Sequence, residues 1–382
     1  MSSIPVEKTV PTEKTVLVFQ GGGALGAYQA GAYEALHEAG IRPDWLAGIS
    51  IGAINSAIIA GSPVDARIDN LRTFWHRVSS GLPGHFLGNG DAMRKWFNES
   101  SAVLGSLTGV PGFFTPRAFA PWNIPGDPMA AISLYDTAPL QETLAGLIDF
   151  DLINSGAIRL SLGAVDVVNG NFNYFDNRHC DFTTKHVAAS GALPPGFAPI
   201  EIDGRYYWDG GIVSNTPLQR ILGGEELEAD LCIFQVDLFS ARGQLPKDLF
   251  DVEAREKEIR FSSRTRLNTD QFRKLQTIRM AAKRLMEKLP DELKDDPDAR
   301  LLEKIGNDCA VTMVHLIYRH AAYESGSKDY EFSRLSVEEH WKAGHDDVVE
   351  TLNHPDWLNR TRPTNGIGVF DLAEKRLRGK KS

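Results

Sequence analysis

The first part of the chain alternates short apolar runs with segments in which apolar residues recur every three or four positions. Residues 14–20 form a β-rich run that stops at three glycines, and residues 25–39 show helical spacing up to Gly40, a typical helix end. Residues 45–49 predict a second strand, and residues 51–60 predict a helix of small side chains. This order of elements predicts a parallel sheet in an α/β layer fold.

The middle of the chain carries two hairpin patterns. Residues 158–176 predict two strands around an Asn-Gly turn, and residues 200–208 predict a second pair around an Asp-Gly turn. A short helix over 183–191 lies between them. A buried strand is expected over 230–239, and a last strand over 311–318.

The composition changes after the 230–239 strand. Residues 251–304 are dense in both charge signs and contain an amphipathic helix, which we interpret as a solvated face without a function. Ser336 and Glu339 form a capping box that predicts the start of a late helix. We therefore expect a flexible N-terminus, an α/β domain and a mainly helical C-terminal extension packed on it, over residues 1–13, 14–240 and 241–382 respectively.

Residues 100–134 differ in kind from the rest of the α/β domain. Only Arg117 and Asp127 are charged, five prolines interrupt the segment, and several of its apolar residues are aromatic. Long uncharged loops of this kind are often lids or binding loops. A loop buried against the core fits the composition equally well.

Charge and cysteine content limit the classes of partner. The net charge of −9 argues against a general nucleic-acid binder, which needs a basic surface. Three cysteines without CxxC spacing argue against a disulfide framework or a cysteine-built zinc site.

Residues 45–64 carry no charge, but their glycines and polar residues indicate strand, turn and helix rather than a membrane span. Because residues 1–14 lack the apolar run of a secretory signal, we expect a cytoplasmic protein.

Gly48-Ile49-Ser50-Ile51-Gly52 matches the G-x-S-x-G pattern of a nucleophile elbow. A nucleophile between a strand and a helix sits on a strained, crowded backbone. Glycines on both sides relieve the crowding, and the helix N-terminus adds a positive dipole. The predicted strand and helix supply this context, which makes Ser50 the candidate nucleophile. The alternative is a serine in an ordinary glycine-flanked turn.

The segment from Gly21 to Gly26 allows two interpretations. It contains the G-x-G-x-x-G fingerprint, which binds dinucleotides when an acidic residue ends the next strand. Asp44 precedes that strand and Ser50 ends it, so the ribose-binding carboxylate is missing. Beside a nucleophile elbow, backbone N–H groups in a glycine loop are better suited to hold a developing oxyanion. We interpret the segment as an oxyanion loop whose candidate residues are Gly21, Gly22, Gly23 and Gly26.

Asp209-Gly210-Gly211 follows the second predicted hairpin. A catalytic serine needs a base, and an aspartate or a histidine can serve. Asp-Gly turns are common, so this motif is a weak signal when taken alone.

The three motifs in this order resemble the patatin-like phospholipases, and the segments around Ser190 and Asn215 are also similar to that family. The likeness spans about residues 14–240, and the remainder resembles the extension of a bacterial subgroup. The resemblance implies a three-layer α/β/α sandwich with a mainly parallel central sheet and a helical extension. The glycines that support its motifs are Gly48, Gly52, Gly210 and Gly211.

The resemblance also implies a serine acyl hydrolase of the lipase or phospholipase A type. Ser50 would attack the ester carbonyl, Asp209 would carry the proton, and the amides of Gly22 and Gly23 would hold the oxyanion until an acyl-enzyme forms. No metal and no cofactor is implied. The expected partner is a lipid or acyl-ester substrate, with transient peripheral contact with a membrane and no nucleic acid, and no oligomeric state is indicated.

Leu25 is a departure from the family pattern, which usually has a basic residue at that position. The absence of that positive charge puts in doubt both strong stabilisation of the oxyanion and a preference for phosphate-bearing head groups. Alternatives within the enzyme class are an esterase, a thioesterase, a transacylase, a polyester depolymerase, or a triad enzyme that uses His315 or His320. A weakly active lipid-binding scaffold is a further alternative. We interpret the segment His345-Asp346-Asp347 as a solvated helix face rather than a metal site.

Overall fold

The architecture is described from a computed structural model over residues 13–79, 91–117, 130–223, 229–262, 265–319 and 327–372. Within these residues the central sheet has nine strands in the order β11-β10-β9-β1-β2-β5-β8-β7, with β6 also paired to β5. Neighbours from β11 to β5 are parallel, whereas β6, β7 and β8 pair antiparallel at one side. The strands are β1 (Lys14–Phe19), β2 (Trp45–Gly48), β5 (Arg159–Asp166), β6 (Phe172–Asp176), β7 (Ile200–Ile202), β8 (Arg205–Asp209), β9 (Leu231–Asp237), β10 (Val311–Ile317) and β11 (Ile367–Phe370).

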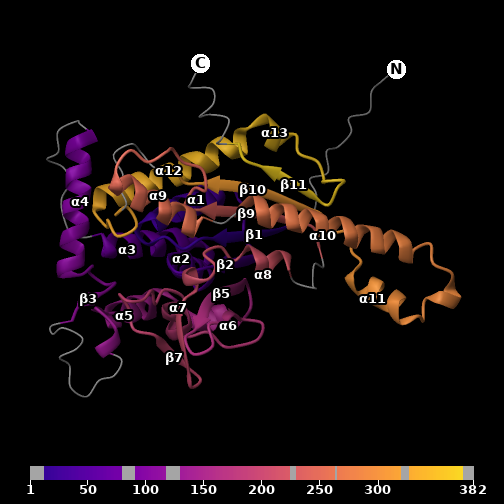
Figure 1. Ribbon diagram of the computed structural model, residues 1–382, viewed down its shortest axis with the longest axis horizontal. Coiled ribbons are helices and arrows are strands. Elements are labelled where there is room, and N and C mark those ends of the chain that lie inside the picture. Colours follow the sequence, from indigo (N-terminus) through magenta and orange to yellow (C-terminus); the bar gives the residue numbers. More distant parts are fainter. Residues whose placement is uncertain are drawn as a thin grey trace.

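Helices cover both faces of this sheet (Figure 1). The α-helices of the described residues are α1 (Gly26–Glu38), α2 (Ile51–Ala60), α3 (Arg67–Val78), α4 (Asp91–Thr108), α5 (Ala138–Leu147), α6 (Phe150–Asn154), α7 (Thr184–Ser190), α8 (Leu218–Leu222), α9 (Leu249–Phe261), α10 (Thr265–Met286), α11 (Pro297–Ile305), α12 (Arg334–Asn353) and α13 (Pro355–Leu358). In Figure 1, α10 and α11 extend from the body as an arm on the right, and α4 stands at the opposite end.

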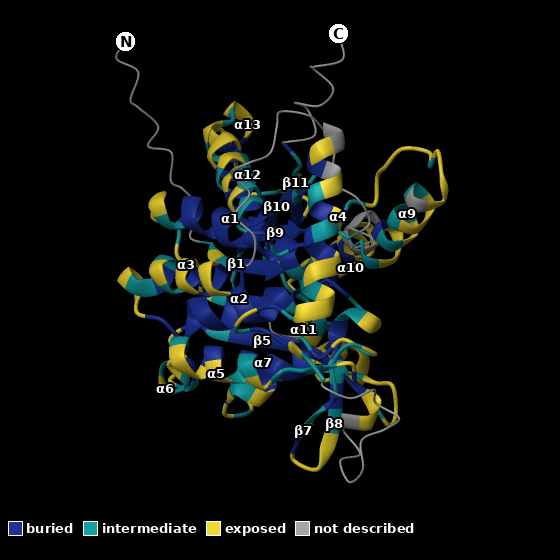
Figure 2. Cartoon of the chain, turned by 90° about the vertical axis from the view of Figure 1, so that its left-hand side faces the viewer, coloured by how far each residue is buried: buried dark blue, intermediate teal, exposed yellow. Residues whose placement is uncertain are grey.

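The side chains of β1 explain the three layers. Leu17 and Phe19 pack on one face into a core shared with α1, α2 and α12, while Val16 and Val18 pack on the other face against α8 and α10. All four are buried, as expected for a central strand of a parallel sheet, and each contributes roughly 1.5–3 kcal/mol of burial free energy. Figure 2 shows the buried sheet at the centre with exposed residues on the outer helices. The predicted α/β/α sandwich is confirmed.

The region after residue 240 contributes strands as well as helices. β10 pairs with β9, and β11 pairs with β10, so both belong to the central sheet. The strand expected over 311–318 is present as β10, but the prediction that it is the last one is wrong. β11 is only four residues long and includes Gly368, which gives a short and weak strand pattern. The division of the chain at residue 240 remains a prediction.

The late helix begins earlier than the capping pattern predicted. α12 starts at Arg334, and its N-cap is Ser333, whose hydroxyl accepts a hydrogen bond from the Ser336 backbone N–H. Ser333 and Ser336 are both suitable N-cap residues by type. The predicted N-cap, Ser336, therefore lies three residues after the observed one, Ser333.

Part of the 100–134 segment lies against the core. α4 covers its start, and the short strands β3 (Thr115–Pro116) and β4 (Tyr135–Asp136) pair with each other. Phe113 and Phe114 are buried in an aromatic cluster with Phe197. This part matches the interpretation as a buried loop. Residues 118–129 lie outside the described residues, as do residues 1–12 of the predicted flexible N-terminus.

Candidate active site

The strand order brings the three sequence motifs to one edge of the sheet. The glycine loop follows β1 and Ser50 follows β2, and these two strands are parallel neighbours. β5 lies next to β2, with Leu162 paired to Gly48, and two residues further along β5 Ala164 pairs with Asp209. Ser50 and Asp209 therefore meet at the carboxyl edge of the parallel strands, where α/β sheets form their sites.

Ser50 occupies the strained turn that the motif predicts. Its backbone has φ 56° and ψ −125°, and it serves as the N-cap of α2 without a side-chain capping bond. A non-glycine residue in this conformation costs roughly 1–3 kcal/mol and is typical of a functional turn. At Gly52 a Cβ atom would collide with the Phe19 carbonyl, so only glycine fits between the elbow and β1.

Ser190 at the end of α7 holds the elbow in place. Its hydroxyl accepts a hydrogen bond from the Ser50 backbone N–H at 3.1 Å and donates one to the Gly163 carbonyl at 2.7 Å. Ser190 is fully buried, so both of its bonds are shielded from water. The sequence resemblance included Ser190 but gave it no role.

Asp209 is a buried carboxyl that faces Ser50. Its side chain is 2% exposed, and its Oδ1 accepts a hydrogen bond from the Gly211 backbone N–H at 2.7 Å. Burial raises the pKa of Asp209 from 3.8 to about 6, against the opposing effect of hydrogen bonds from Ser50 and from Gly211. A carboxyl with a pKa near the working pH is suited to accept and return a proton.

The glycine loop carries backbone donors beside Ser50. A Cβ atom on Gly21 would lie 3.1 Å from the Ser50 Cβ, which places the start of the loop against the serine. The Gly21 N–H donates to the Asn215 carbonyl at 3.2 Å, and the Ala24 N–H donates to the Asp329 carbonyl at 2.8 Å. Within the part of the chain that the structure describes, the backbone N–H groups of Gly22 and Gly23 have no acceptor.

The remaining glycines of the motifs take their expected places. Gly48 ends β2 and Gly26 opens α1. Gly210 and Gly211 form a single 3-10 turn after Asp209. Leu25 is fully buried in the hydrophobic core, so this position adds packing to the loop and no charge to the site.

A buried chain of amides ties the loop to the helix that carries Ser50. Gln29 donates to the Gln20 carbonyl at 2.7 Å, and Asn55 of α2 donates to the Gly26 carbonyl at 2.9 Å and to Gln29 at 3.0 Å. Trp75 completes the chain by donating its indole N–H to Asn55 at 3.0 Å. Because these side chains are essentially inaccessible to water, the chain fixes both ends of the glycine loop relative to α2.

Of the two histidines considered for a triad, His315 lies away from this site. His315 lies on β10, which β9 and β1 separate from β2, and burial lowers its pKa to about 4. His320 lies outside the described residues.

His345, which the sequence analysis assigned to a solvated helix face, has its Nε2 3.0 Å from Glu38 Oε2 on α1. Across the described ranges no group of three metal-ligating side chains is found, and no helix is long and apolar enough to cross a membrane.

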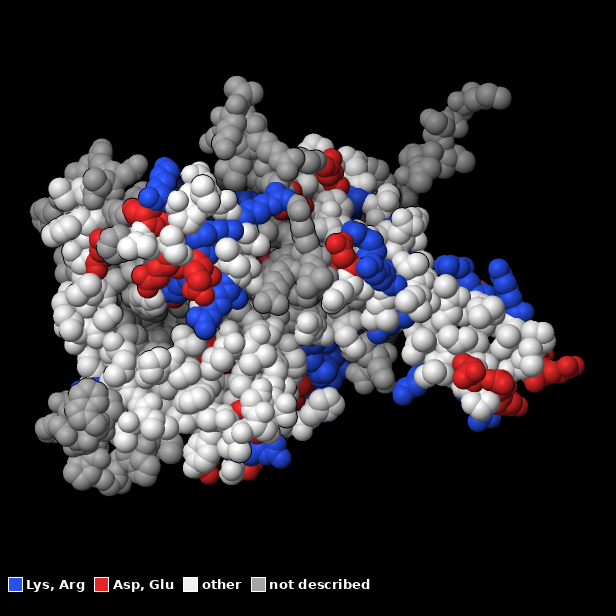
Figure 3. Space-filling model, viewed as in Figure 1, with Lys and Arg blue, Asp and Glu red and all other residues white. Residues whose placement is uncertain are grey.

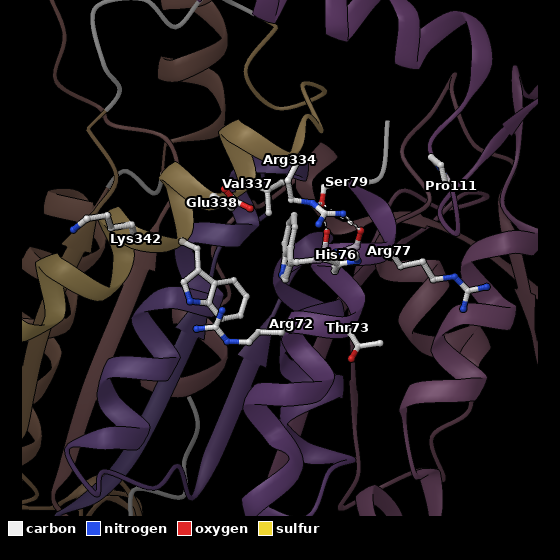
Figure 4. A pocket seen from close by; sticks show the side chains of 12 residues that line it. Arg72, Thr73, His76, Arg77, Ser79, Pro111, Arg334, Val337, Glu338 and Lys342 are labelled. Atoms are coloured by element: carbon white, nitrogen blue, oxygen red, sulfur yellow. Dashed lines mark hydrogen bonds between the residues drawn. The ribbon is translucent and has the colours of Figure 1, made fainter. Parts of the chain in front are cut away.

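A cavity of about 850 Å³ lies elsewhere, between α3 and α12 (Figure 4). Arg72 and Arg334 line it together with Trp75, whereas neither Ser50 nor Asp209 does. Arg334 donates to the Ser79 hydroxyl at 2.7 Å and to the His76 carbonyl at 2.6 Å. The chemistry of the three motifs therefore lies outside this cavity.

Comparison with known protein families gives two matches. A model described as patatin-like phospholipase matches residues 17–222, which is more than half of the chain, and a model described as patatin phospholipase matches residues 259–364. No curated protein matches the sequence.

Two solved structures show weak overall likeness. VipD from Legionella pneumophila has 15% sequence identity and a TM-score of 0.39, over 97% of this chain and 74% of that one. The complex of SpcU with ExoU from Pseudomonas aeruginosa has 14% identity and a TM-score of 0.26, over 93% of this chain and 76% of that one. The family assignment rests on the sequence matches.

Proposed function

The chain belongs to the patatin-like phospholipase family and is a lipid ester hydrolase, and we propose that it hydrolyses acyl esters of lipids through a Ser50–Asp209 dyad. The observation that carries this proposal is a serine in a strained elbow facing a buried carboxyl whose pKa is raised to about 6. The two N–H groups at Gly22 and Gly23 supply the donors that an oxyanion needs.

The reaction proceeds in two halves. Ser50 Oγ attacks the ester carbonyl while Asp209 takes the hydroxyl proton, and the N–H groups of Gly22 and Gly23 donate to the oxyanion. The intermediate collapses, the carbon–oxygen ester bond breaks, and Asp209 returns the proton to the leaving alcohol. A water molecule then attacks the acyl-Ser50 ester, with Asp209 again taking and returning a proton, and the carboxylic acid leaves. No redox step occurs.

The pH dependence of turnover tests the role of Asp209. The base must be ionised to accept a proton, so the rate falls as pH drops through the raised pKa of about 6. We expect kcat/KM for a short soluble ester to rise with pH along a single limb and to level off above neutrality. A limb centred near the ordinary aspartate pKa of about 4 would contradict the assignment.

We further propose that α4 brings the site to a lipid surface. One face of α4 carries a row of apolar side chains that are each at least half exposed, and we call this row the stripe. It consists of Met93, Trp96, Val103 and Leu107. Tyr135 donates to the Ser106 carbonyl at 3.0 Å, which joins the end of α4 to β4. Figure 3 shows no described charged side chain over most of this end of the molecule. Exposed apolar stripes of this kind mark contact surfaces.

The stripe continues toward the catalytic carboxyl. Leu134 precedes β4 and is 46% exposed, and its N–H donates to the Gly196 carbonyl at 3.1 Å. Leu193 of the same loop is 40% exposed and follows Ala192, whose carbonyl accepts the Asp209 N–H at 3.0 Å. A lipid surface that rests on the stripe would therefore lie at the rim of the site.

Substitution of the stripe separates lipid contact from chemistry. We expect the double variant Trp96→Ser, Leu107→Ser to reduce hydrolysis of phospholipid vesicles and co-sedimentation with them by about tenfold or more, because apolar area is lost from the contact. Turnover of a short soluble ester should stay within about twofold. The matched control is Leu301→Ser, which removes from α11 a leucine that is 58% exposed. Equal losses on both substrates would exclude a surface role for α4.

A further inference from the structure

Two segments of the C-terminal region reach the glycine loop. The backbone carbonyl of Asp329 accepts the Ala24 N–H at 2.8 Å. The same carbonyl lies so close to Gly23, whose φ is 54°, that any Cβ atom at that position would collide with it. A residue more than three hundred positions away in sequence thus contacts the middle of the loop.

The end of α9 holds the start of the loop. The carbonyl of Phe261, the last residue of α9, accepts hydrogen bonds from Gln20 Nε2 at 2.9 Å and from Asn215 Nδ2 at 3.1 Å. Asn215 Nδ2 also donates to the Gly21 carbonyl at 2.9 Å. Gln20 is fully buried, and its Oε1 accepts the Leu238 and Phe239 N–H groups, so the loop entrance is fixed on several sides.

Buried ion pairs join α9 to the segment that carries Asp329. Lys257 Nζ lies 2.5 Å from Asp329 Oδ1, and Lys328 Nζ lies 2.7 Å from Glu258 Oε1. The side chains of the second pair are both 7% exposed, and those of the first pair are 16% and 14% exposed. Lys257 also contacts the Tyr330 hydroxyl. In Figure 3, side chains of both charge signs gather over α9.

We propose that Lys257 and Asp329 are positioning residues for ester hydrolysis and that the C-terminal region completes the oxyanion loop. The ion pair holds the Asp329 carbonyl on the Ala24 N–H, which fixes the peptide that follows Gly23. The loop then keeps the N–H groups of Gly22 and Gly23 as donors in one arrangement. Since donors stabilise a transition state only when they are preorganised, loosening this contact lowers the chemical rate more than substrate binding. The inference rests on the proposed function of the loop.

The test compares two lysines of the C-terminal region. Lys257→Met removes the buried partner of Asp329, and Lys257→Arg keeps the charge. Lys283→Met removes from α10 the partner of Asp308 in an exposed ion pair. For each variant, kcat and KM are measured with a short soluble ester, and the extent and rate of labelling by a fluorophosphonate are measured by intact mass. Asp329→Asn, which keeps the backbone carbonyl, serves as a second variant if Lys257→Met does not fold.

We expect Lys257→Met to reach one label per chain, with labelling rate and kcat lowered about tenfold or more and KM changed by less than about twofold. Lys257→Arg should restore most of kcat, Lys283→Met should match the wild type, and Asp329→Asn should lower kcat by a smaller factor. Wild-type kcat in both Lys257→Met and Asp329→Asn would overturn the proposal. A lower labelled fraction with a normal kcat per labelled site would also overturn the proposal, because that result shows only a loss of folded protein. Failure of the wild type to label would instead refute the proposed function.

Discussion

Ser50→Ala is expected to reduce ester hydrolysis by at least about a thousandfold, because no acyl-enzyme can form without the hydroxyl. The fold should survive. The side chain makes no capping bond in α2, and alanine meets the same backbone strain at φ 56° as serine does. Initial rates with a short ester, together with a thermal melt, measure both effects.

The same variant has a second expected consequence at Asp209. The Ser50 hydroxyl lowers the pKa of this carboxyl, so its removal should raise that pKa above about 6. Residual turnover within about tenfold of the wild type would contradict Ser50 as the nucleophile.

Asp209→Asn is expected to lower kcat by several powers of ten, because the amide can accept the Gly211 N–H but cannot accept a proton. His315→Ala should leave kcat within a few-fold, since two strands, β9 and β1, separate β10 and its His315 from β2. Loss of kcat in His315→Ala together with a retained kcat in Asp209→Asn would exclude the dyad. Initial rates at pH 8 with a saturating short ester decide between them.

Asp209→Asn should also change stability, with a sign set by the raised pKa. Because the folded state binds the Asp209 proton more tightly than the unfolded state does, the favourable contribution exists at low pH and is lost as pH rises from 3.8 to about 6. The rise in pKa corresponds to roughly 3 kcal/mol of unfavourable free energy above that range. Denaturant unfolding at pH 8 should therefore find the variant more stable than the wild type, whereas at pH 4 the gain should be small.

The parts of the site that the sequence predicts are those defined by short local patterns. Gly48 to Gly52 specifies a strand, a turn and a helix within a few residues, and Ser50 is found with its backbone in that turn. Val16 and Leu17 belong to a continuous apolar run in β1 and pack on opposite faces of the sheet. A run of this kind is typical of a strand buried on both faces, which predicts the central sheet. Local rules of this kind do not depend on the rest of the chain.

The parts that the sequence does not predict depend on distant contacts. Asp329 meets Ala24 through a backbone carbonyl, which leaves no side-chain signature at either position. Gln20 and Asn55 look like ordinary polar residues in apolar surroundings, and their roles follow only from where the loop and α2 lie in space. Leu25 is explained by its burial in the core, which a pattern of glycines cannot indicate.

The most direct test of the central claim is intact-mass measurement after incubation with a fluorophosphonate, which reacts with activated serines. The wild type should gain one adduct, Ser50→Ala should gain none, and Asp209→Asn should react far more slowly than the wild type. An adduct on Ser50→Ala would place the nucleophile on another residue, and no adduct on the wild type would contradict an activated serine at position 50.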